Sequence, residues 1–252
     1  MDFSKRVILV TGAARGIGSA TANAFARLGG SVAVHYCSSQ KQAQALAKSL
    51  PGDEHTTFQA DLTSPDDCER LMTEVMRHYG RLDVLVNNAG IYEVKALANL
   101  EFRDWQATWK RTLDADLIGP ANLCFLAAKM MMRQTSGHII NISSRGAFRG
   151  EPEAPAYGAA KAGLNQLSQS LAWALAPYNI FVGVVAPGFV RTDMTAELLD
   201  GPQGDAIRAQ SPLKRAATPE EIAEAMVRLA ADGMLYATGC ILDVNGASYL
   251  RS

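Results

Sequence analysis

The chain has 252 residues, of which 48% are hydrophobic, and this is enough to bury the core of one large domain or two small ones. Its formal net charge of -1, with acidic and basic residues interspersed, argues against a nucleic-acid-binding or membrane-surface protein. Its apolar runs are too short for a signal peptide or a membrane-spanning helix, so we expect a cytoplasmic protein that binds small molecules.

Residue types that commonly bind metals are scattered along the chain. Its four cysteines and four histidines lie far apart, and no C-x-x-C motif occurs; the residues are Cys37, Cys68, Cys124, Cys240, His35, His55, His78 and His138. We therefore expect free thiols in a reducing compartment and no metal site.

Short apolar or β-branched runs alternate with helical patterns from end to end. The predicted strands are residues 6–10, 31–36, 55–60, 82–86, 137–143, 180–186 and 239–244. They lack inside/outside alternation, which indicates burial on both faces and predicts an α/β protein, a doubly wound parallel sheet of about seven strands with helices on both faces. No linker or repeat interrupts residues 1–252, so we expect a single domain. Residues 193–211, which include a Gly/Pro-rich loop, are a candidate substrate lid.

Three glycines, Gly12, Gly16 and Gly18, lie between the first predicted strand and the following helix. Glycines leave room for a phosphate to approach the backbone, and the N–H groups and dipole of a helix N-terminus attract it. The spacing is G-x-x-x-G-x-G, and the loop predicts a nucleotide-binding site.

Tyr157 and Lys161 lie four residues apart in the stretch APAYGAAKAG, so both face the same side of a predicted helix. The alternative is a packed tyrosine beside a lysine that reaches water. A phenol titrates near pH 10, and we expect an ammonium group about 4 Å away to lower the Tyr157 pKa toward the working pH. Tyr157 would then exchange a proton with a carbonyl oxygen, and Ser143 or Ser144, after the fifth strand, would stabilise the oxyanion.

Four motifs follow one another along the chain: TGAARGIG (residues 11–18), NNAG (87–90), YGAAK (157–161) and PGFVRT (187–192). With these motifs the chain resembles the short-chain dehydrogenase/reductase family over essentially its whole length. The resemblance implies a Rossmann-type sheet that binds a nicotinamide dinucleotide at the carboxyl ends of its strands. It also implies carbonyl or alcohol chemistry without a metal, and a homo-oligomer, commonly a tetramer.

The residues after the second predicted strand favour NADP(H) over NAD(H). An acidic residue usually follows this strand in NAD-binding folds, but here no acid occurs until Asp53. Arg15 would instead bind a 2′-phosphate, with Ser38 or Ser39 as a hydroxyl donor, unless Arg15 is only a solvated loop residue.

The resemblance also implies the remaining site residues. Ser144, thirteen residues before Tyr157, matches the family serine, so the expected catalytic residues are Ser144, Tyr157, Lys161 and Asp116. Asp61 and the Leu62 backbone would contact the adenine. The expected cofactor-binding residues are Gly12, Arg15, Gly16, Ile17, Gly18, Ser38, Asp61, Leu62, Asn88, Gly90, Tyr157, Lys161, Pro187, Gly188, Val190 and Thr192.

Asp116 departs from the family pattern, which often has asparagine at this position to support a proton relay. An ionised aspartate accepts hydrogen bonds but donates none. Two alternatives remain open: Asp116 pairs with Lys161 through water, or burial keeps its carboxyl group protonated.

The substrate is less well defined by the sequence. Arg145 and Arg149 would attract an anionic substrate or the phosphate of a thioester carrier, unless they form solvated pairs with Glu151 or Glu153. The resemblance favours a 3-oxoacyl-thioester reductase. A dehydrogenase or reductase of a small ketone, sugar or polyol is the alternative, and a catalytically weak dinucleotide-binding regulator and a nucleotide-sugar epimerase are alternatives of other classes.

Overall fold

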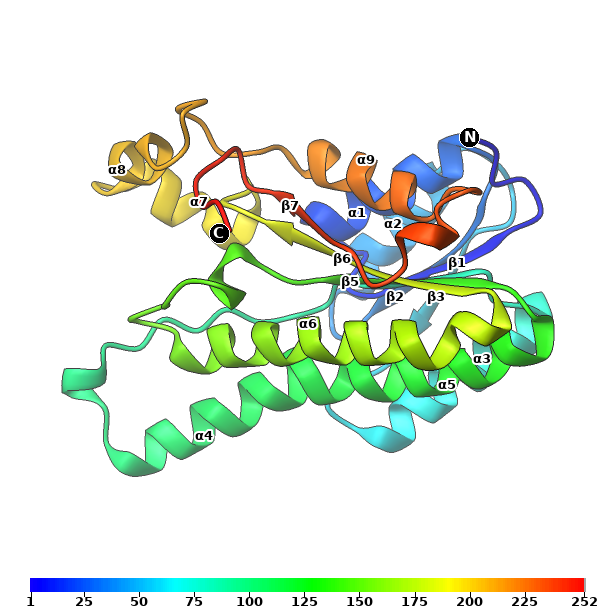
Figure 1. The fold of residues 1–252 in the computed structure, drawn as a ribbon, viewed down its shortest axis with the longest axis horizontal. Helices are drawn as coiled ribbons and strands as arrows, with labels where there is room; N and C mark the ends of the chain where they lie inside the picture. The colour runs from blue at the N-terminus through cyan, green and yellow to red at the C-terminus, as the bar shows by residue number, and fades with distance from the viewer. Residues whose placement is uncertain (252) are drawn as a thin grey trace.

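A computed structural model describes residues 1–251, and its centre is one seven-stranded parallel sheet in the order β3-β2-β1-β4-β5-β6-β7 (Figure 1). The strands are β1 Val7–Val10, β2 Ser31–Tyr36, β3 Thr56–Gln59, β4 Val84–Asn87, β5 Gly137–Ile142, β6 Ile180–Pro187 and β7 Ile241–Val244. Each predicted strand is present, and the predicted doubly wound α/β class is confirmed.

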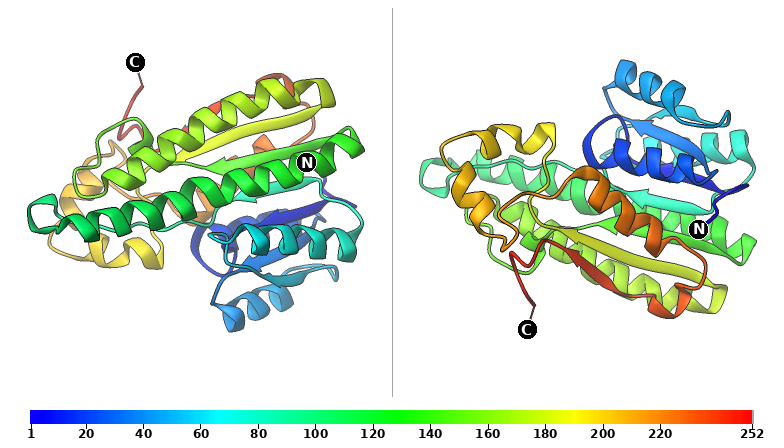
Figure 2. Two further views of the ribbon diagram at one scale, coloured as in Figure 1. Left: turned by 90° about the horizontal axis from the view of Figure 1, so that it is seen from below. Right: turned by 90° about the horizontal axis from the view of Figure 1, so that it is seen from above.

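Helices cover both faces of this sheet. They are α1 Gly16–Arg27, α2 Gln40–Ser49, α3 Pro65–Tyr79, α4 Phe102–Leu113, α5 Gly119–Gln134, α6 Pro155–Leu175, α7 Asp193–Asp200, α8 Gly204–Ala209 and α9 Pro219–Leu229. One layer contains α1, α2 and α9, and the other contains α3, α5 and α6, as the two opposite views in Figure 2 show. A π-helical turn, Asp114–Ile118, joins α4 to α5.

The core explains why the strands lack alternation in the sequence. Along β1, Val10 packs in a cluster with Phe25 of α1, whereas its neighbour Leu9 packs in a second cluster with Leu123 of α5. All four side chains are buried. Successive residues of a strand point to opposite faces, so a strand between two helical layers must be apolar at every position. Burial of each such large side chain contributes about 2 kcal/mol.

Local sequence sets where the site helices begin. Helix α1 begins at Gly16, whose positive φ of 55° suits a residue without a Cβ. Helix α6 begins at Pro155, a position that tolerates proline because its N–H group would have no partner there. Tyr157 therefore lies in the first turn of α6 and Lys161 lies one turn later.

The order of the strands places the site. The chain leaves β1 toward β2 on one side and continues from β4 on the other, so the connections after β1 and β4 diverge. Such a point creates a crevice at the carboxyl edge of a parallel sheet. Helices α7 and α8 project beyond this end of the molecule (Figure 1). Within residues 1–251, none of the helices combines the length and the apolar character needed to span a bilayer.

Candidate active site

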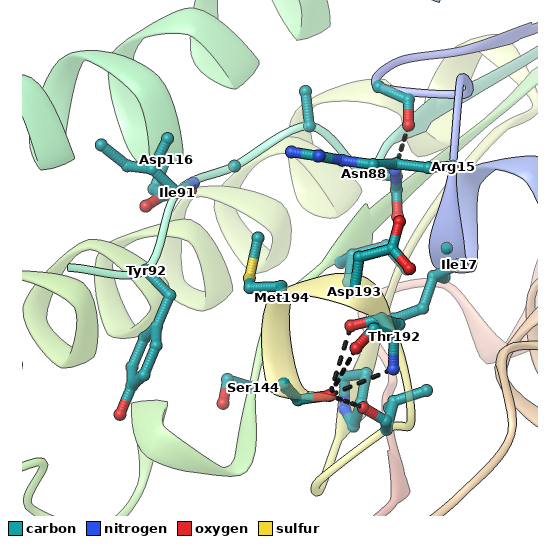
Figure 3. A pocket seen from close by; sticks show the side chains of 18 of the residues that line it. Arg15, Ile17, Asn88, Ile91, Tyr92, Asp116, Ser144, Thr192, Asp193 and Met194 are labelled. Atoms are coloured by element: carbon teal, nitrogen blue, oxygen red, sulfur yellow. Dashed lines mark hydrogen bonds between the residues drawn. The ribbon is translucent and has the colours of Figure 1, made fainter. Parts of the chain in front are cut away.

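A cleft of about 360 Å³ opens at the carboxyl ends of the central strands. Most of the predicted site residues line it: Gly12, Arg15, Gly16, Ile17, Ser38, Asn88, Gly90, Asp116, Ser144, Tyr157, Lys161, Pro187, Gly188, Val190 and Thr192. In Figure 3 the start of α7, with Asp193 and Met194, lies between the glycine-loop side chain of Ile17 and the side of the cleft that carries Asp116 and Tyr92. Segments far apart in the sequence thus share one cavity.

The glycine loop after β1 has the shape that a phosphate requires. Gly12 has a φ of 60°, in the left-handed region. A Cβ on Gly18 would collide with the Gly12 carbonyl oxygen and would lie 2.7 Å from Asn88 Nδ2. This amide already donates to the Thr11 carbonyl oxygen at 2.8 Å. The packed loop presents the N-terminus of α1 to the cleft, so these residues fit the diphosphate of a dinucleotide.

Gly18, Asp61 and Leu62 lie outside the cleft lining. Gly18 packs against Gly12 and Asn88 and so supports the glycine loop. Asp61 accepts hydrogen bonds from the backbone N–H (3.0 Å) and hydroxyl (2.8 Å) of Thr63, and Leu62 belongs to the core against α3 and α5. The expected adenine contacts of Asp61 and Leu62 stay predictions.

His35, a residue to which sequence analysis gave no role, holds the glycine loop in place. Its Nδ1 accepts the Gly12 N–H at 3.0 Å, and its Nε2 lies 3.1 Å from the Ala60 carbonyl oxygen. A carbonyl only accepts, so Nε2 carries the proton and the ring is neutral. Burial lowers the His35 pKa to about 4 and favours this neutral form. A histidine inside an otherwise apolar strand was the available signal.

Arg15 lies at one end of the cleft. Arg15 precedes α1, is exposed, and lines the cavity together with Ser38 and Ser39 after β2. No ion-pair partner lies within 4.0 Å of Arg15 among residues 1–251. A guanidinium that shares a cavity with two hydroxyls and has no carboxylate of residues 1–251 within 4.0 Å is suited to an anionic group.

Ser144, Tyr157 and Lys161 meet at the other end of the cleft. Ser144, at the end of β5, accepts the Gly146 N–H at 3.0 Å through its Oγ. The ammonium Nζ of Lys161 lies 5.5 Å from the centre of the Tyr157 ring and donates to the Ile142 carbonyl oxygen at 3.1 Å. The carboxyl ends of β5 and the first turns of α6 thus bring a hydroxyl, a phenol and an ammonium together.

Asp116 lies directly against this group. It is fully buried in the π-helical turn, and its Oδ1 lies 3.5 Å from Lys161 Nζ and accepts the Ile91 N–H at 3.1 Å. No residue that the structure describes donates a hydrogen bond to its Oδ2. Burial raises the Asp116 pKa, although Lys161 and the Ile91 N–H oppose the shift. The pair with Lys161 is direct and not through water, which corrects the first alternative, whereas burial acts in the direction of the second.

The electrostatics at Tyr157 correct one expectation. The sequence predicts that Lys161 lowers the Tyr157 pKa, but in the structure that pKa is raised. Burial is the main cause, the Asp116 charge adds to it, and the Ser144 hydroxyl opposes it. Lys161 cannot act alone on the phenol because Asp116 lies 3.5 Å from its ammonium group. The phenol consequently holds its proton throughout the neutral range.

The segment after β6 completes the cleft. Pro187, Gly188 and Val190 line the cavity, and the Val190 backbone pairs with Ala217. Thr192 caps α7, which lies within the candidate lid. The expected contacts of these residues with the cofactor stay predictions.

Several further residues line the cleft that sequence analysis did not select for the site. The Tyr92 ring packs edge-on against Tyr157, with centroids 5.0 Å apart. Glu151 and Met194 also face the cavity. Loop residues without a shared motif give no sequence signal of the direction in which they point.

The fold and the site define a class of protein, the α/β oxidoreductases that bind a nicotinamide dinucleotide at the carboxyl edge of a parallel sheet. Residues 12–247 match the family model described as Enoyl-(Acyl carrier protein) reductase. The chain is 38% identical over 247 residues to the 3-oxoacyl-(acyl-carrier-protein) reductase of Synechocystis sp., with 97% of each chain covered.

Solved structures give the same result. A dehydrogenase/reductase from Sinorhizobium meliloti 1021 has a TM-score of 0.91 and 29% identity, with 99% of this chain and 97% of that chain covered. A short chain dehydrogenase from Burkholderia cenocepacia in complex with NADP has a TM-score of 0.89 and 29% identity, with 98% and 99% covered. The chain belongs to the short-chain dehydrogenase/reductase family. It is an oxidoreductase that acts on carbonyl or alcohol groups with a nicotinamide dinucleotide.

Proposed function

We propose that this protein is an NADP(H)-dependent reductase of a carbonyl compound, with Ser144, Tyr157 and Lys161 as its catalytic residues and Asp116 as a residue that acts through Lys161. The observation that carries the proposal is the meeting of these side chains at one end of a cleft whose other end carries Arg15. The bound dinucleotide would supply the hydride. The protein would supply the proton and would hold the substrate and the dinucleotide in position.

The contacts in the site indicate what each catalytic residue would do. The backbone N–H of Gly146 occupies a lone pair of Ser144 Oγ, which leaves the hydroxyl proton free to turn toward a substrate oxygen. Tyr157 donates its phenolic proton to that oxygen as negative charge develops. Lys161, buried beside the phenol, then stabilises the phenolate until a proton returns from water.

The test of the proton donor is Tyr157→Phe, with Tyr178→Phe at a partly exposed position far from the cleft as the matched control. We expect Tyr157→Phe to bind NADPH normally, measured by fluorescence titration, and to lower kcat at least 100-fold in an assay of NADPH absorbance. The control should keep both properties. Near-normal turnover of Tyr157→Phe would contradict the role of the phenol.

The proposed preference for NADP(H) rests on Arg15 and on the absence of a carboxylate after β2. We expect Arg15→Ala to lower the ratio of kcat/KM for NADPH to that for NADH by about 10-fold or more, because a charge-assisted bond to a phosphate is lost. Arg27→Ala, at the far end of α1, is the control. An unchanged ratio would remove Arg15 from the proposal.

The proposed substrates to examine first are 3-oxoacyl thioesters, because the Synechocystis relative carries that activity in its name. Small ketones, sugars and polyols form the second group. The assay compares kcat/KM across acetoacetyl thioesters, diketones and keto sugars with NADPH. A preference of at least 10-fold for the thioester would support the first group, and the reverse preference would support the second.

We also propose a cytoplasmic homotetramer. Trp173 of α6 is 86% exposed and Phe125 of α5 is 60% exposed, on two helices that pack side by side. Aromatic side chains that are this exposed are typical of subunit contacts. Light scattering should give the mass of four chains for the natural protein, and Trp173→Asp should lower it. A mass that Trp173→Asp leaves unchanged would contradict a subunit contact at α5 and α6.

Finally, we propose that residues 1–252 form one domain in which residues 193–211 close over bound ligand. Asp193, Met194 and Thr195 of α7 already line the cleft. We expect limited proteolysis to cut this segment in the free protein and NADP⁺ to protect it, whereas unchanged cleavage would contradict a lid.

A further inference from the structure

Arg145 is a buried cation without a counter-ion among residues 1–251. It follows Ser144 directly, is only 5% exposed, and stacks on Phe189 with 4.8 Å between the guanidinium carbon and the ring centre. Its Nη2 donates to the neutral Gln210 Oε1 at 2.6 Å, and its Nη1 has no hydrogen-bond partner in the described part of the chain. Burial of a guanidinium is unfavourable unless its charge and its N–H groups are compensated.

The other charges nearby do not compensate it. Arg149 and Glu151 approach each other to 4.0 Å, and Arg215 binds both carboxylate oxygens of Glu221 at 2.6 and 2.7 Å. No carboxylate among residues 1–251 lies within 4.0 Å of Arg145. Its neighbours are therefore paired with each other, and Arg145 is left with excess positive charge.

Arg145 and Phe189 form a wall that two cavities share. One side is the active-site cleft, and the other is a smaller cavity of about 150 Å³. Arg145 thus brings a charged donor that has no partner among residues 1–251 to the edge of the active-site cleft.

We propose that Arg145 binds a carboxylate of the substrate, so that the preferred substrates are short oxo acids and the corresponding hydroxy acids. This inference rests on the proposed function, because it assumes that the reacting carbonyl lies at Ser144 and Tyr157. A planar guanidinium matches the geometry of a carboxylate and binds it with charge-assisted hydrogen bonds.

Ser144 and Arg145 are consecutive in the chain, and both line the active-site cleft. A short oxo acid can therefore place its carbonyl at Ser144 and its carboxylate at Arg145.

The kinetic test uses acetoacetate and its methyl ester, which keep the same ketone and differ in charge. We expect Arg145→Met to lower kcat/KM for acetoacetate about 30-fold or more, mainly through KM, and to change the ester less than about threefold. Arg145→Lys should recover part of the loss. Arg149→Met, which removes a neighbouring paired arginine, is the matched control and should leave the preference for the acid unchanged.

A binding test makes the inference independent of turnover. Sodium butyrate should raise the Tm of the natural protein in the presence of NADP⁺, whereas neutral butyramide should not, and Arg145→Met should abolish the difference. If no ketone is reduced but this difference is observed, the carboxylate site stands and the proposed reductase function falls. If the ester is reduced while acetoacetate has no advantage, or if Arg145→Met affects both substrates equally, the carboxylate site is refuted and the reductase stands.

Discussion

The Asp116→Asn substitution isolates the effect of one buried charge on the phenol of Tyr157. Asp116 Oδ1 lies 3.5 Å from Lys161 Nζ, which in turn lies 5.5 Å from the Tyr157 ring centre. The carboxylate is thus within about 9 Å of the ring, where two unit charges interact by about 2 kcal/mol at an effective dielectric constant near 20. One pKa unit corresponds to about 1.4 kcal/mol, so loss of the carboxylate lowers the Tyr157 pKa by about one unit or more.

The side chain of asparagine has almost the same shape as that of aspartate, and its amide oxygen can still accept the Ile91 N–H that Asp116 now accepts at 3.1 Å. The substitution therefore removes charge with little change in packing. It also leaves Lys161 without its carboxylate partner, and this strengthens the positive field that acts on the phenolate.

The assay is the pH dependence of kcat/KM for alcohol oxidation with NADP⁺, from about pH 6 to about pH 10, where the phenolate form of Tyr157 acts as the base. We expect the rising limb of Asp116→Asn to move about one unit toward acid, so that oxidation at a fixed pH on this limb is about 10-fold faster. Asp114→Asn is the control, because Asp114 pairs with Lys110 at 2.6 Å on the surface. A profile that coincides with that of the natural protein, or moves toward alkali, would refute the coupling.

Two further predictions concern stability in urea. His35→Phe removes the hydrogen-bond partner of the Gly12 N–H and of the Ala60 carbonyl, and it should lower the free energy of unfolding by about 2 to 4 kcal/mol. An unchanged free energy of unfolding would contradict the role of His35 in holding the glycine loop. The unfolded state binds a proton at His35 near pH 6.5 but the folded state only near pH 4, so stability should fall as the pH drops through this window, and less steeply in His35→Phe. Arg215 and a backbone N–H lower the Glu221 pKa from 4.5 to about 2. Glu221→Gln should therefore lower the free energy of unfolding by about 1 kcal/mol or less above pH 4.5 and should leave it unchanged near pH 2. Equal losses at both pH values would contradict the pair of Arg215 and Glu221.

The sheet was predictable because every inner strand shows the same signal. Residues such as Leu9 and Val10 are apolar on both sides of the strand, and only a sheet between two helical layers requires that pattern. The glycine loop and the Tyr157–Lys161 pair were also visible, because their spacing is local and is set by a turn or by one turn of helix.

The electrostatics and the bracing of the site could not be derived from local spacing. The raised Tyr157 pKa depends first on burial and then on Asp116, which lies 41 residues earlier in the chain and reaches Lys161 only after the chain packs. The bridge from His35 to the glycine loop depends on which ring nitrogen carries the proton, and a neighbouring strand sets that choice. Arg145 was recognised as a possible anion-binding residue, but the absence of a counter-ion emerges only from the packed structure.

Gly90 has a consequence for how this protein can vary. A Cβ on Gly90 would collide with Asp116 Oδ1 and would lie 3.4 Å from Lys161 Nζ. Even an alanine at position 90 would therefore compete with the carboxylate for the same space. Natural variants should change these two positions together, and a library that randomises both should yield active pairs that neither single substitution would reveal.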